Sequence, residues 1–231
     1  MTKLILTRHG QSVWNAENRF TGWVDVDLSN KGVLEAEKSG QIIKDLNINI
    51  DISYTSYLKR AIKTLTTILK KNNLELKFNT AWQLNERHYG SLTGLNKEET
   101  KNKIGEEQFK KYRRSWDIAP PPMEEKSENL NLFSPLNASI PVGMTPFTES
   151  LKSTYDRVVP FYENEIKKNL AENKIIQMKE AAIKEIKDTS IKIAVDSVKK
   201  IIFTSVDKSK LDALFQKNLD ETKEELKKIN S

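Results

Sequence analysis

The sequence has no cysteine and only two histidines among its 231 residues. Without cysteine, the chain has no disulfides, no thiolate zinc ligands and no cysteine nucleophile. Two histidines also argue against a metal site built from imidazoles. These absences narrow the chemistry open to the chain.

Glycine and proline are missing from the last part of the chain. All eight glycines occur by Gly143 and all seven prolines by Pro160, so residues 161–231 lack the residues that ordinarily make tight turns. Apolar and small residues there recur at spacings of three and four, which predicts a helical tail; they are Ile183, Ile186, Ile193, Ala194, Val198, Ile201, Ile202, Ser205 and Val206. A strand over residues 201–206 is the alternative, because short β-branched runs fit both structures.

Long hydrophobic runs are also absent. The apolar start of the chain is interrupted by Arg8, too early for a signal peptide or a membrane span, so we expect a cytoplasmic protein. The net charge of +6 arises from lysines that alternate with acids, and no aromatic–basic stripe accompanies them. An anionic small molecule is therefore favoured over a nucleic acid as the partner.

Strand-like and helix-like segments alternate through the first ninety residues. We expect strands at residues 3–7 and 51–56, a third apolar stretch at 78–84, a helix capped by Ser29 and running to Ile43, and a helix over 58–70. This alternation is typical of an α/β fold with a parallel sheet, whose ligand sites lie at the carboxyl ends of its strands. His9 and Glu86 follow two such strands.

Prolines crowd into the segment that follows. Six of them lie between Pro120 and Phe147, among few periodic apolar positions. Such a long irregular segment in a compact domain is usually functional or mobile. We expect residues 119–148 to form a loop that covers the site as a lid.

The first candidate for chemistry is Arg8-His9-Gly10, which follows the first expected strand. A neutral histidine can attack phosphorus and hold the phosphoryl group covalently, while guanidinium groups neutralise the phosphate oxygens. The tripeptide alone is a weak signal, because an isolated histidine is more often a structural residue.

Longer motifs strengthen this hypothesis. RHGQSVWN at residues 8–15 and NRFTGWVDVDL at 18–28 are followed by YTS at 54–56, LKRA at 58–61, LNERHYG at 84–90 and GLNK at 94–97. Further matches are the arginine pair at 113–114, the prolines at 120–122, TESL at 148–151 and RVVP at 157–160. In this order they closely resemble the cofactor-dependent phosphoglycerate mutases of the histidine phosphatase superfamily, although that family usually has glutamate where Gln11 stands.

The resemblance implies a phosphoglycerate mutase of glycolysis and gluconeogenesis, primed by 2,3-bisphosphoglycerate, with no metal, and often dimeric. It implies His9 as the phosphorylated nucleophile and Glu86 as the proton donor and acceptor. It also implies phosphate or carboxylate contacts from Arg8, Asn15, Thr21, Gly22, Arg60, Arg87, Tyr89, Lys97, Arg113 and Arg114.

Each of these assignments has a structural alternative. Glu86 can cap a helix or pair with Arg87, and Arg113 and Arg114 can be surface charges. We interpret Trp14 and Trp23 as packing residues rather than ligand-stacking groups.

The resemblance ends near residue 176. The family would continue there into a strand and a second catalytic histidine, whereas this chain reads Gln177-Met178-Lys179-Glu180. We therefore expect an incomplete mutase-like domain over 1–176, with impaired activity and an uncovered sheet edge beside residues 3–7. Residues 177–231 resemble the helical C-terminal part of an F-type ATP synthase b subunit, so the alternative function is a non-catalytic or weakly phosphatase-active fusion whose tail binds a partner helix. Either a gene fusion or a gene-assembly error would produce this junction.

Overall fold

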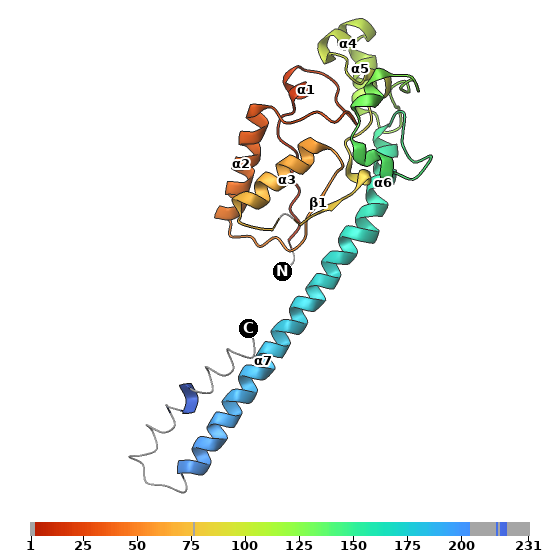
Figure 1. Ribbon diagram of the computed structural model, residues 1–231. Helices are drawn as coiled ribbons and strands as arrows, with labels where there is room; N and C mark the ends of the chain where they lie inside the picture. The colour runs from red at the N-terminus through yellow and green to blue at the C-terminus, as the bar shows by residue number, and fades with distance from the viewer. Residues whose placement is uncertain (1–2, 76, 204–215, 217, 221–231) are drawn as a thin grey trace. The chain divides into compact units, whose positions relative to one another are not determined.

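The computed structural model describes residues 3–75, 77–203, 216 and 218–220 (Figure 1). The chain divides into two compact units, Met1–Lys168 and Asn169–Ser231. The helices of the first unit are α1 (Val13–Ala16), α2 (Asn30–Asp45), α3 (Lys59–Lys71), α4 (Lys97–Ile104), α5 (Glu106–Arg114) and α6 (Leu151–Phe161). Short turns of 3-10 helix occur at Trp82–Leu84, Gly90–Leu92, Glu128–Leu132 and Pro135–Ser139.

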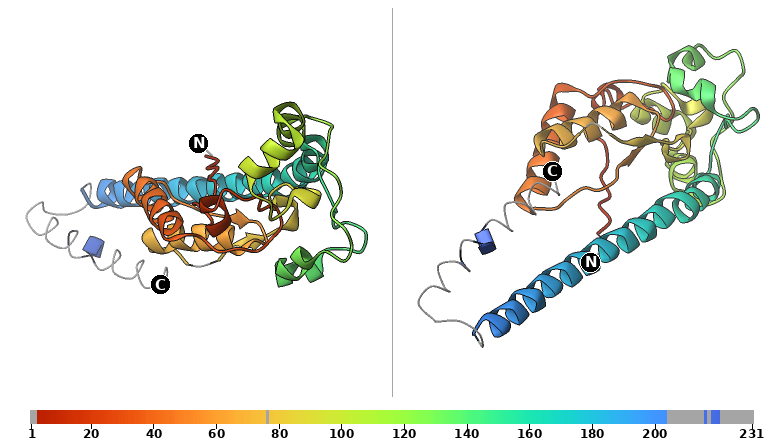
Figure 2. Two further views of the ribbon diagram at one scale, coloured as in Figure 1. Left: turned by 90° about the horizontal axis from the view of Figure 1, so that it is seen from above. Right: turned by 60° about the horizontal axis from the view of Figure 1, so that its bottom comes forward.

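Helices α2 and α3 pack side by side, as the two views of Figure 2 also show. The hydroxyl of Ser29 accepts a hydrogen bond from the Gly32 N–H and caps α2, as the sequence predicts. Gly40 lies against α3, because a Cβ built on it would be 2.9 Å from the Cβ of Lys71. The small residue therefore allows the two helices to approach closely.

The sheet consists of two short parallel strands, β1 (Tyr54–Thr55) and β2 (Asn79–Thr80), joined through α3. Tyr54 is opposite Asn79, and Thr55 is opposite Thr80. Backbone hydrogen bonds from Asn79 to Ser53 and from Ala81 to Thr55 complete the ladder. The fold is thus a mixed α/β arrangement with a small parallel sheet, as expected in class, but the strands expected over 51–56 and 78–84 are shorter than predicted.

The strand expected at residues 3–7 is not formed. These residues have no regular secondary structure and are exposed, with 48% of Leu4, 38% of Ile5 and 85% of Leu6 accessible. A strand needs a neighbour to pair its backbone groups. The segment at 174–176, which continues as a strand in the family that the sequence resembles, instead lies inside a helix. The prediction of a buried strand at 3–7 was therefore wrong.

The loop over 119–148 is irregular apart from its two short 3-10 turns. It is tied to the rest of the unit at its middle, where Val24 and Phe133 form an antiparallel bridge and the Asp25 N–H donates to the Leu132 carbonyl at 2.7 Å. The hydroxyl of Ser134 also donates to the Tyr57 carbonyl at 2.9 Å. These contacts anchor the loop beside the segment that carries Trp23 and Val24.

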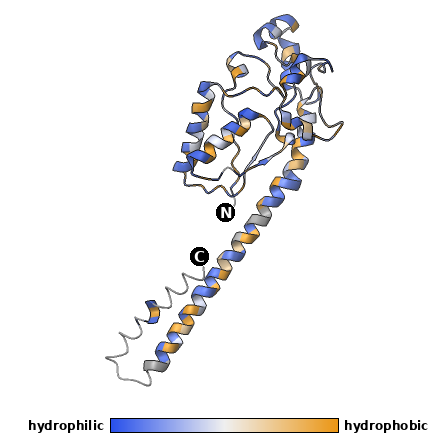
Figure 3. Ribbon diagram, viewed as in Figure 1, coloured by the Kyte–Doolittle hydropathy of each residue, from blue (hydrophilic) through white to orange (hydrophobic). Residues whose placement is uncertain are grey.

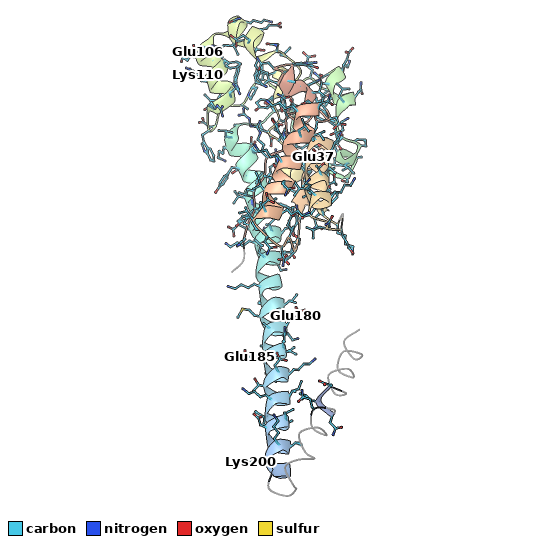
Figure 4. The ribbon with its side chains drawn as sticks, turned by 90° about the vertical axis from the view of Figure 1, so that its left-hand side faces the viewer. Glu37, Glu106, Lys110, Glu180, Glu185 and Lys200 are labelled. Carbon is cyan, nitrogen blue, oxygen red and sulfur yellow. The ribbon has the colours of Figure 1, made fainter. Side chains whose placement is uncertain are left out.

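Helix α6 continues through a π-helical turn at Tyr162–Ile166 into the long helix α7 (Lys167–Phe203). Apolar and charged residues alternate along α7 (Figure 3), and Glu180 and Glu185 project from it (Figure 4). The helical tail is thus confirmed as far as residue 203, and the alternative strand is wrong for residues 201–203. Residues 204–206 of that alternative lie outside the described residues. No helix in the described part of the chain is long and apolar enough to span a membrane.

Candidate active site

His9 lies in the segment that leads into α1, and its tautomer is set by a backbone contact. Its Nδ1 is 2.7 Å from the carbonyl oxygen of Gly10, which only accepts hydrogen bonds, so Nδ1 carries the proton. In the neutral ring, the lone pair is therefore on Nε2. The Gly10 N–H donates to the hydroxyl of Thr64 on α3 at 3.3 Å, which fixes the segment against that helix.

Gly10 also meets α2 at Gly32. A Cβ built on Gly10 would be 2.2 Å from the carbonyl oxygen of Gly32, and one on Gly32 would be 2.1 Å from the carbonyl of Gln11. Any side chain would push the two backbones apart. This contact and the bond to Thr64 fix the position of the His9 imidazole.

Glu86 faces His9. Its Oε2 is 3.7 Å from Nε2 of His9 and 2.9 Å from Nη2 of Arg60, which reaches over from α3. Burial of the Glu86 carboxyl opposes its charged form, but the contacts with His9 and Arg60 outweigh that cost and hold its pKa below the usual range. A carboxylate therefore lies next to Nε2 of the imidazole.

Arg60 is completely buried and bonds to the protein itself. Besides Glu86, it donates to the carbonyl oxygens of Val24 at 2.8 Å and Gly22 at 2.7 Å. Gly22 has a φ of +56°, and a Cβ there would crowd the Arg87 carbonyl at 3.2 Å. The two residues thus belong to the site, where Arg60 orients Glu86 and Gly22 shapes the backbone that Arg60 holds.

Lys97 lies within electrostatic reach of two arginines and of the Glu86 carboxylate. Lys97, at the start of α4, is half-buried, and burial together with the charges of Arg113 and Arg8 lowers its pKa, while Glu86 acts in the opposite direction. Three cations and one carboxylate within electrostatic reach leave an excess of positive charge. An anion bound there would relieve the mutual repulsion.

Arg87 and Thr21 carry buried polar atoms that have no protein partner among the described residues. Arg87 donates through Nη2 to the carbonyls of Tyr112 and Arg113, its guanidinium lies 4.8 Å from the Tyr89 ring, and its Nη1 is unpartnered. The Thr21 hydroxyl is 2% exposed and likewise unpartnered. Buried donors of this kind are normally satisfied by a ligand or water.

The remaining predicted residues have other surroundings. The side-chain oxygen of Asn15 accepts from the Ser12 N–H in the capping box of α1, and Arg114 is exposed in the last turn of α5. Near the other end of α5, Glu106 and Lys110 form an exposed ion pair at 2.8 Å (Figure 4). Trp14 and Trp23 are buried, as expected of packing residues.

His88 is a buried structural residue. Its ring packs against Trp23 and Phe133, with centroids 5.9 and 5.6 Å away, and its Nδ1 accepts from the Gly90 N–H at 2.9 Å. Burial, with a smaller contribution from Arg157, lowers the pKa of His88 to about 4. A ring held neutral in aromatic packing does not serve as the second catalytic histidine.

Sequence reasoning gave no role to one further pair. Arg157 of α6 and Glu149 are joined by hydrogen bonds of 2.6 and 2.9 Å, and Arg157 also donates to three carbonyls of the segment that carries Glu86. Glu149 lies in the TESL motif and Arg157 in the RVVP motif. Contacts to main-chain carbonyls cannot be inferred from a sequence, because every residue has a carbonyl. Among the described residues, no group of histidine, aspartate and glutamate side chains is placed to hold a metal ion.

The chain is similar in sequence to known proteins. A sequence profile of the histidine phosphatase superfamily (branch 1) matches residues 4–132. A 2,3-bisphosphoglycerate-dependent phosphoglycerate mutase of Pelagibacter ubique is 53% identical over 180 residues, covering 76% of this chain and 74% of the relative. The 2,3-bisphosphoglycerate-dependent phosphoglycerate mutase 2 of Bacteroides thetaiotaomicron is 52% identical over 167 residues, covering 72% and 67%.

The fold has solved relatives as well. A mycobacterial glucosyl-3-phosphoglycerate phosphatase, complexed with VO3, superposes with a TM-score of 0.51 at 19% identity, over 69% of this chain and 64% of that one. At this identity the likeness shows the fold alone. The profile and the curated relatives show more: the chain belongs to branch 1 of the histidine phosphatase superfamily and, within it, to the 2,3-bisphosphoglycerate-dependent phosphoglycerate mutase family.

Proposed function

We propose that the chain interconverts 2-phosphoglycerate and 3-phosphoglycerate through a phosphohistidine at His9, primed by 2,3-bisphosphoglycerate, in the cytoplasm. The observation that carries the proposal is the His9–Glu86 pair. The neutral imidazole offers the lone pair of Nε2 as the nucleophile, and a carboxyl group able to move a proton lies 3.7 Å from it. The curated relatives of about 50% identity bear the name of this reaction.

His9 and Glu86 divide the work. Once His9 is phosphorylated, the Glu86 carboxylate removes the proton from the free hydroxyl of a monophosphoglycerate, whose oxygen takes the phosphoryl group as its bond to Nε2 breaks, so that 2,3-bisphosphoglycerate forms. Nε2 of His9 then attacks the phosphorus of the other phosphate group, the bond between that phosphorus and its ester oxygen breaks, and the oxygen takes the proton back from Glu86. Both atoms and protons balance over the cycle, and Arg60 keeps Glu86 in place for each transfer.

The residues around the pair suit a bisphosphorylated glycerate. Arg8, Lys97 and Arg113 supply the excess of positive charge, and the unpartnered Nη1 of Arg87 and hydroxyl of Thr21 are donors for anionic oxygens. We assign Gly22 and Tyr89 to the same site, because they contact Arg60 and Arg87. For Asn15 and Arg114, substrate contact stays a prediction from the family resemblance. The bisphosphate supplies the phosphoryl group that first occupies His9.

Turnover is impaired in this proposal, because the second catalytic histidine of the family has no counterpart. The sequence has two histidines, and the other one, His88, is packed between aromatic rings. Loss of one preorganised donor to a transferring phosphoryl group typically lowers the rate by about 10²- to 10³-fold. We therefore expect slow phosphorylation of His9 and mutase turnover at least about 10²-fold below that of an intact relative.

The test is incubation with labelled 2,3-bisphosphoglycerate, followed by mass spectrometry of acid-labile phosphate. The label should appear slowly on His9 and be abolished in His9→Ala. His88→Asn, which removes the other imidazole, is the matched control and should keep the label. A folded parent chain that never incorporates label, or one that turns over at the rate of an intact relative, would contradict the proposal.

We infer further that a mutase-like part over 1–176 is followed by a tail over 177–231 that pairs with a helix of another chain. Apolar side chains of this tail on α7 support the inference, because 63% of Met178, 65% of Ile186 and 61% of Ile193 is exposed. Light scattering of the purified chain separates a homodimer from a monomer that needs a different partner. If neither the mass nor the helicity of the chain increases with protein concentration, the partner is not a second copy of this chain.

A further inference from the structure

Arg157 and Glu149 form a buried ion pair that the proposed reaction does not use. Only 9% of the Arg157 side chain and 3% of the Glu149 side chain is exposed. Nε and Nη2 of Arg157 donate to the two carboxylate oxygens at 2.6 and 2.9 Å, a bidentate arrangement that fixes the plane of the guanidinium. A pair this deeply buried is costly to desolvate, so its remaining hydrogen bonds matter.

Those remaining bonds all go to one short segment. Nη1 of Arg157 donates to the carbonyl of Gln83 at 2.6 Å, and Nη2 donates to the carbonyls of Asn85 and Glu86 at 3.0 and 3.2 Å. Glu149 holds the next residue, because its Oε2 accepts from the His88 N–H at 2.8 Å. Every nitrogen of the guanidinium is therefore bonded, and the backbone from 83 to 88 is held from the side of α6.

Two arginines from different helices thus bind Glu86, one at its carboxylate and one at its main-chain carbonyl. Arg60 of α3 bonds its carboxylate, and Arg157 of α6 bonds its main-chain carbonyl. With the backbone and the carboxylate both fixed, the side chain between them has little freedom to swing away from His9. An error of about 1 Å in placing a catalytic group can lower a rate by about 10²-fold.

We propose that Arg157, oriented by Glu149, is a positioning residue that keeps the Glu86 carboxylate within reach of Nε2 of His9. The inference rests on the proposed role of Glu86 as the proton donor and acceptor. It adds that α6, which contributes no group to the reacting atoms, sets the geometry of the proton transfer.

The test is a double-mutant cycle between Arg157 and Glu86. Arg157→Lys keeps the charge opposite Glu149 but loses the fork that reaches the carbonyls. We expect it to slow phosphorylation of His9 by about tenfold or more in the parent chain, and by less than about twofold in the Glu86→Gln background. Arg19→Lys is the matched control, because Arg19 also bonds a carbonyl and a carboxylate, but these belong to Gly94 and Glu17 and not to the Glu86 segment; it should leave the rate unchanged.

A second readout does not depend on turnover. Two histidines give two sets of imidazole signals by NMR, so the His9 resonance reports directly on the group facing it. Arg157→Lys should shift the His9 signal in the parent chain and leave it unmoved once Glu86 is glutamine. If the parent forms no phosphoenzyme, the proposed function fails, and this cycle still decides the role of Arg157.

Three results would overturn the positioning role. One is an equal loss of rate, or an equal shift of His9, with and without the Glu86 carboxylate, which is what a purely structural arginine gives. Another is no effect of Arg157→Lys on either readout in a chain that melts cooperatively. The third is an Arg19→Lys variant that behaves like Arg157→Lys, since the effect would then not be specific to the Glu86 segment.

Discussion

Lowering the pH from 7 to 5 should destabilise the first unit through His88. The pKa of His88 is about 4 in the folded protein, because burial penalises the charged ring, with Arg157 adding to the effect; the ordinary value is 6.5. Between these two pH values, His88 binds a proton in the unfolded chain but not in the folded chain. The free energy of unfolding must therefore fall as the pH drops through this window, and it is unaffected by His88 above it.

The size of the effect follows from the two pKa values. Each pH unit well inside the window lowers the free energy of unfolding by about 1.4 kcal/mol. The change from pH 7 to pH 5 covers half a pH unit above the window, where the loss is small, and one and a half pH units inside it. The free energy of unfolding therefore falls by about 2 kcal/mol between pH 7 and pH 5. Glu86 adds little in this range, because a carboxyl whose folded pKa is lowered loses its stabilisation only as the pH falls below the unfolded value of about 4.5.

Urea denaturation followed by tryptophan fluorescence measures this loss. All four tryptophans, Trp14, Trp23, Trp82 and Trp116, lie in the first unit, so the signal reports on that unit. His88→Asn, whose amide oxygen can replace the Nδ1 acceptor, should flatten the dependence on pH, whereas His9→Gln should keep it. A stability that is constant from pH 7 to 5, or that falls equally in His88→Asn, would show that burial of a neutral His88 is not the cause.

Three further predictions concern single residues. Leu6→Ala should change the free energy of unfolding by less than about 0.5 kcal/mol, since 85% of Leu6 is exposed. A loss of about 2 kcal/mol or more in urea denaturation would instead support the prediction that residues 3–7 form a buried strand. Gly10→Ala should cost about 1–3 kcal/mol, because its Cβ would lie 2.2 Å from the Gly32 carbonyl, and an unchanged melting curve would contradict that contact. Lys97→Gln should weaken phosphoglycerate binding by about tenfold in calorimetry. Because the pKa of Lys97 is lowered, its side chain loses its charge at a lower pH than an ordinary lysine does, and the affinity of the parent chain should begin to fall at that lower pH. If the same loss of affinity is found in Lys97→Gln, another group causes it.

Local signals predicted α2 and α3 well, whereas the sequence analysis made no prediction for α1, α4, α5 and α6. Ser29 as a cap and the buried spacing of Ala36, Gly40 and Ile43 are properties of one segment, and α2 forms as they indicate. The strand at 3–7 depended on a partner far along the chain, and no local feature of Leu4 to Leu6 reports its absence. Two arguments brought His9 and Glu86 together: their positions after expected strands, of which the one before His9 is not formed, and the family resemblance. Neither argument indicates the main-chain carbonyls that Arg157 contacts.

The exposure of residues 3–8 also makes the chain susceptible to proteolysis. Proteases cleave irregular, accessible backbone, and Arg8 has the basic side chain that trypsin-like enzymes select. The bond that such an enzyme cuts is the one between Arg8 and His9. A single cleavage would remove one cation of the site and make the nucleophile the new amino-terminal residue, so the chain can be inactivated at its chemistry while the packed helices behind it stay intact.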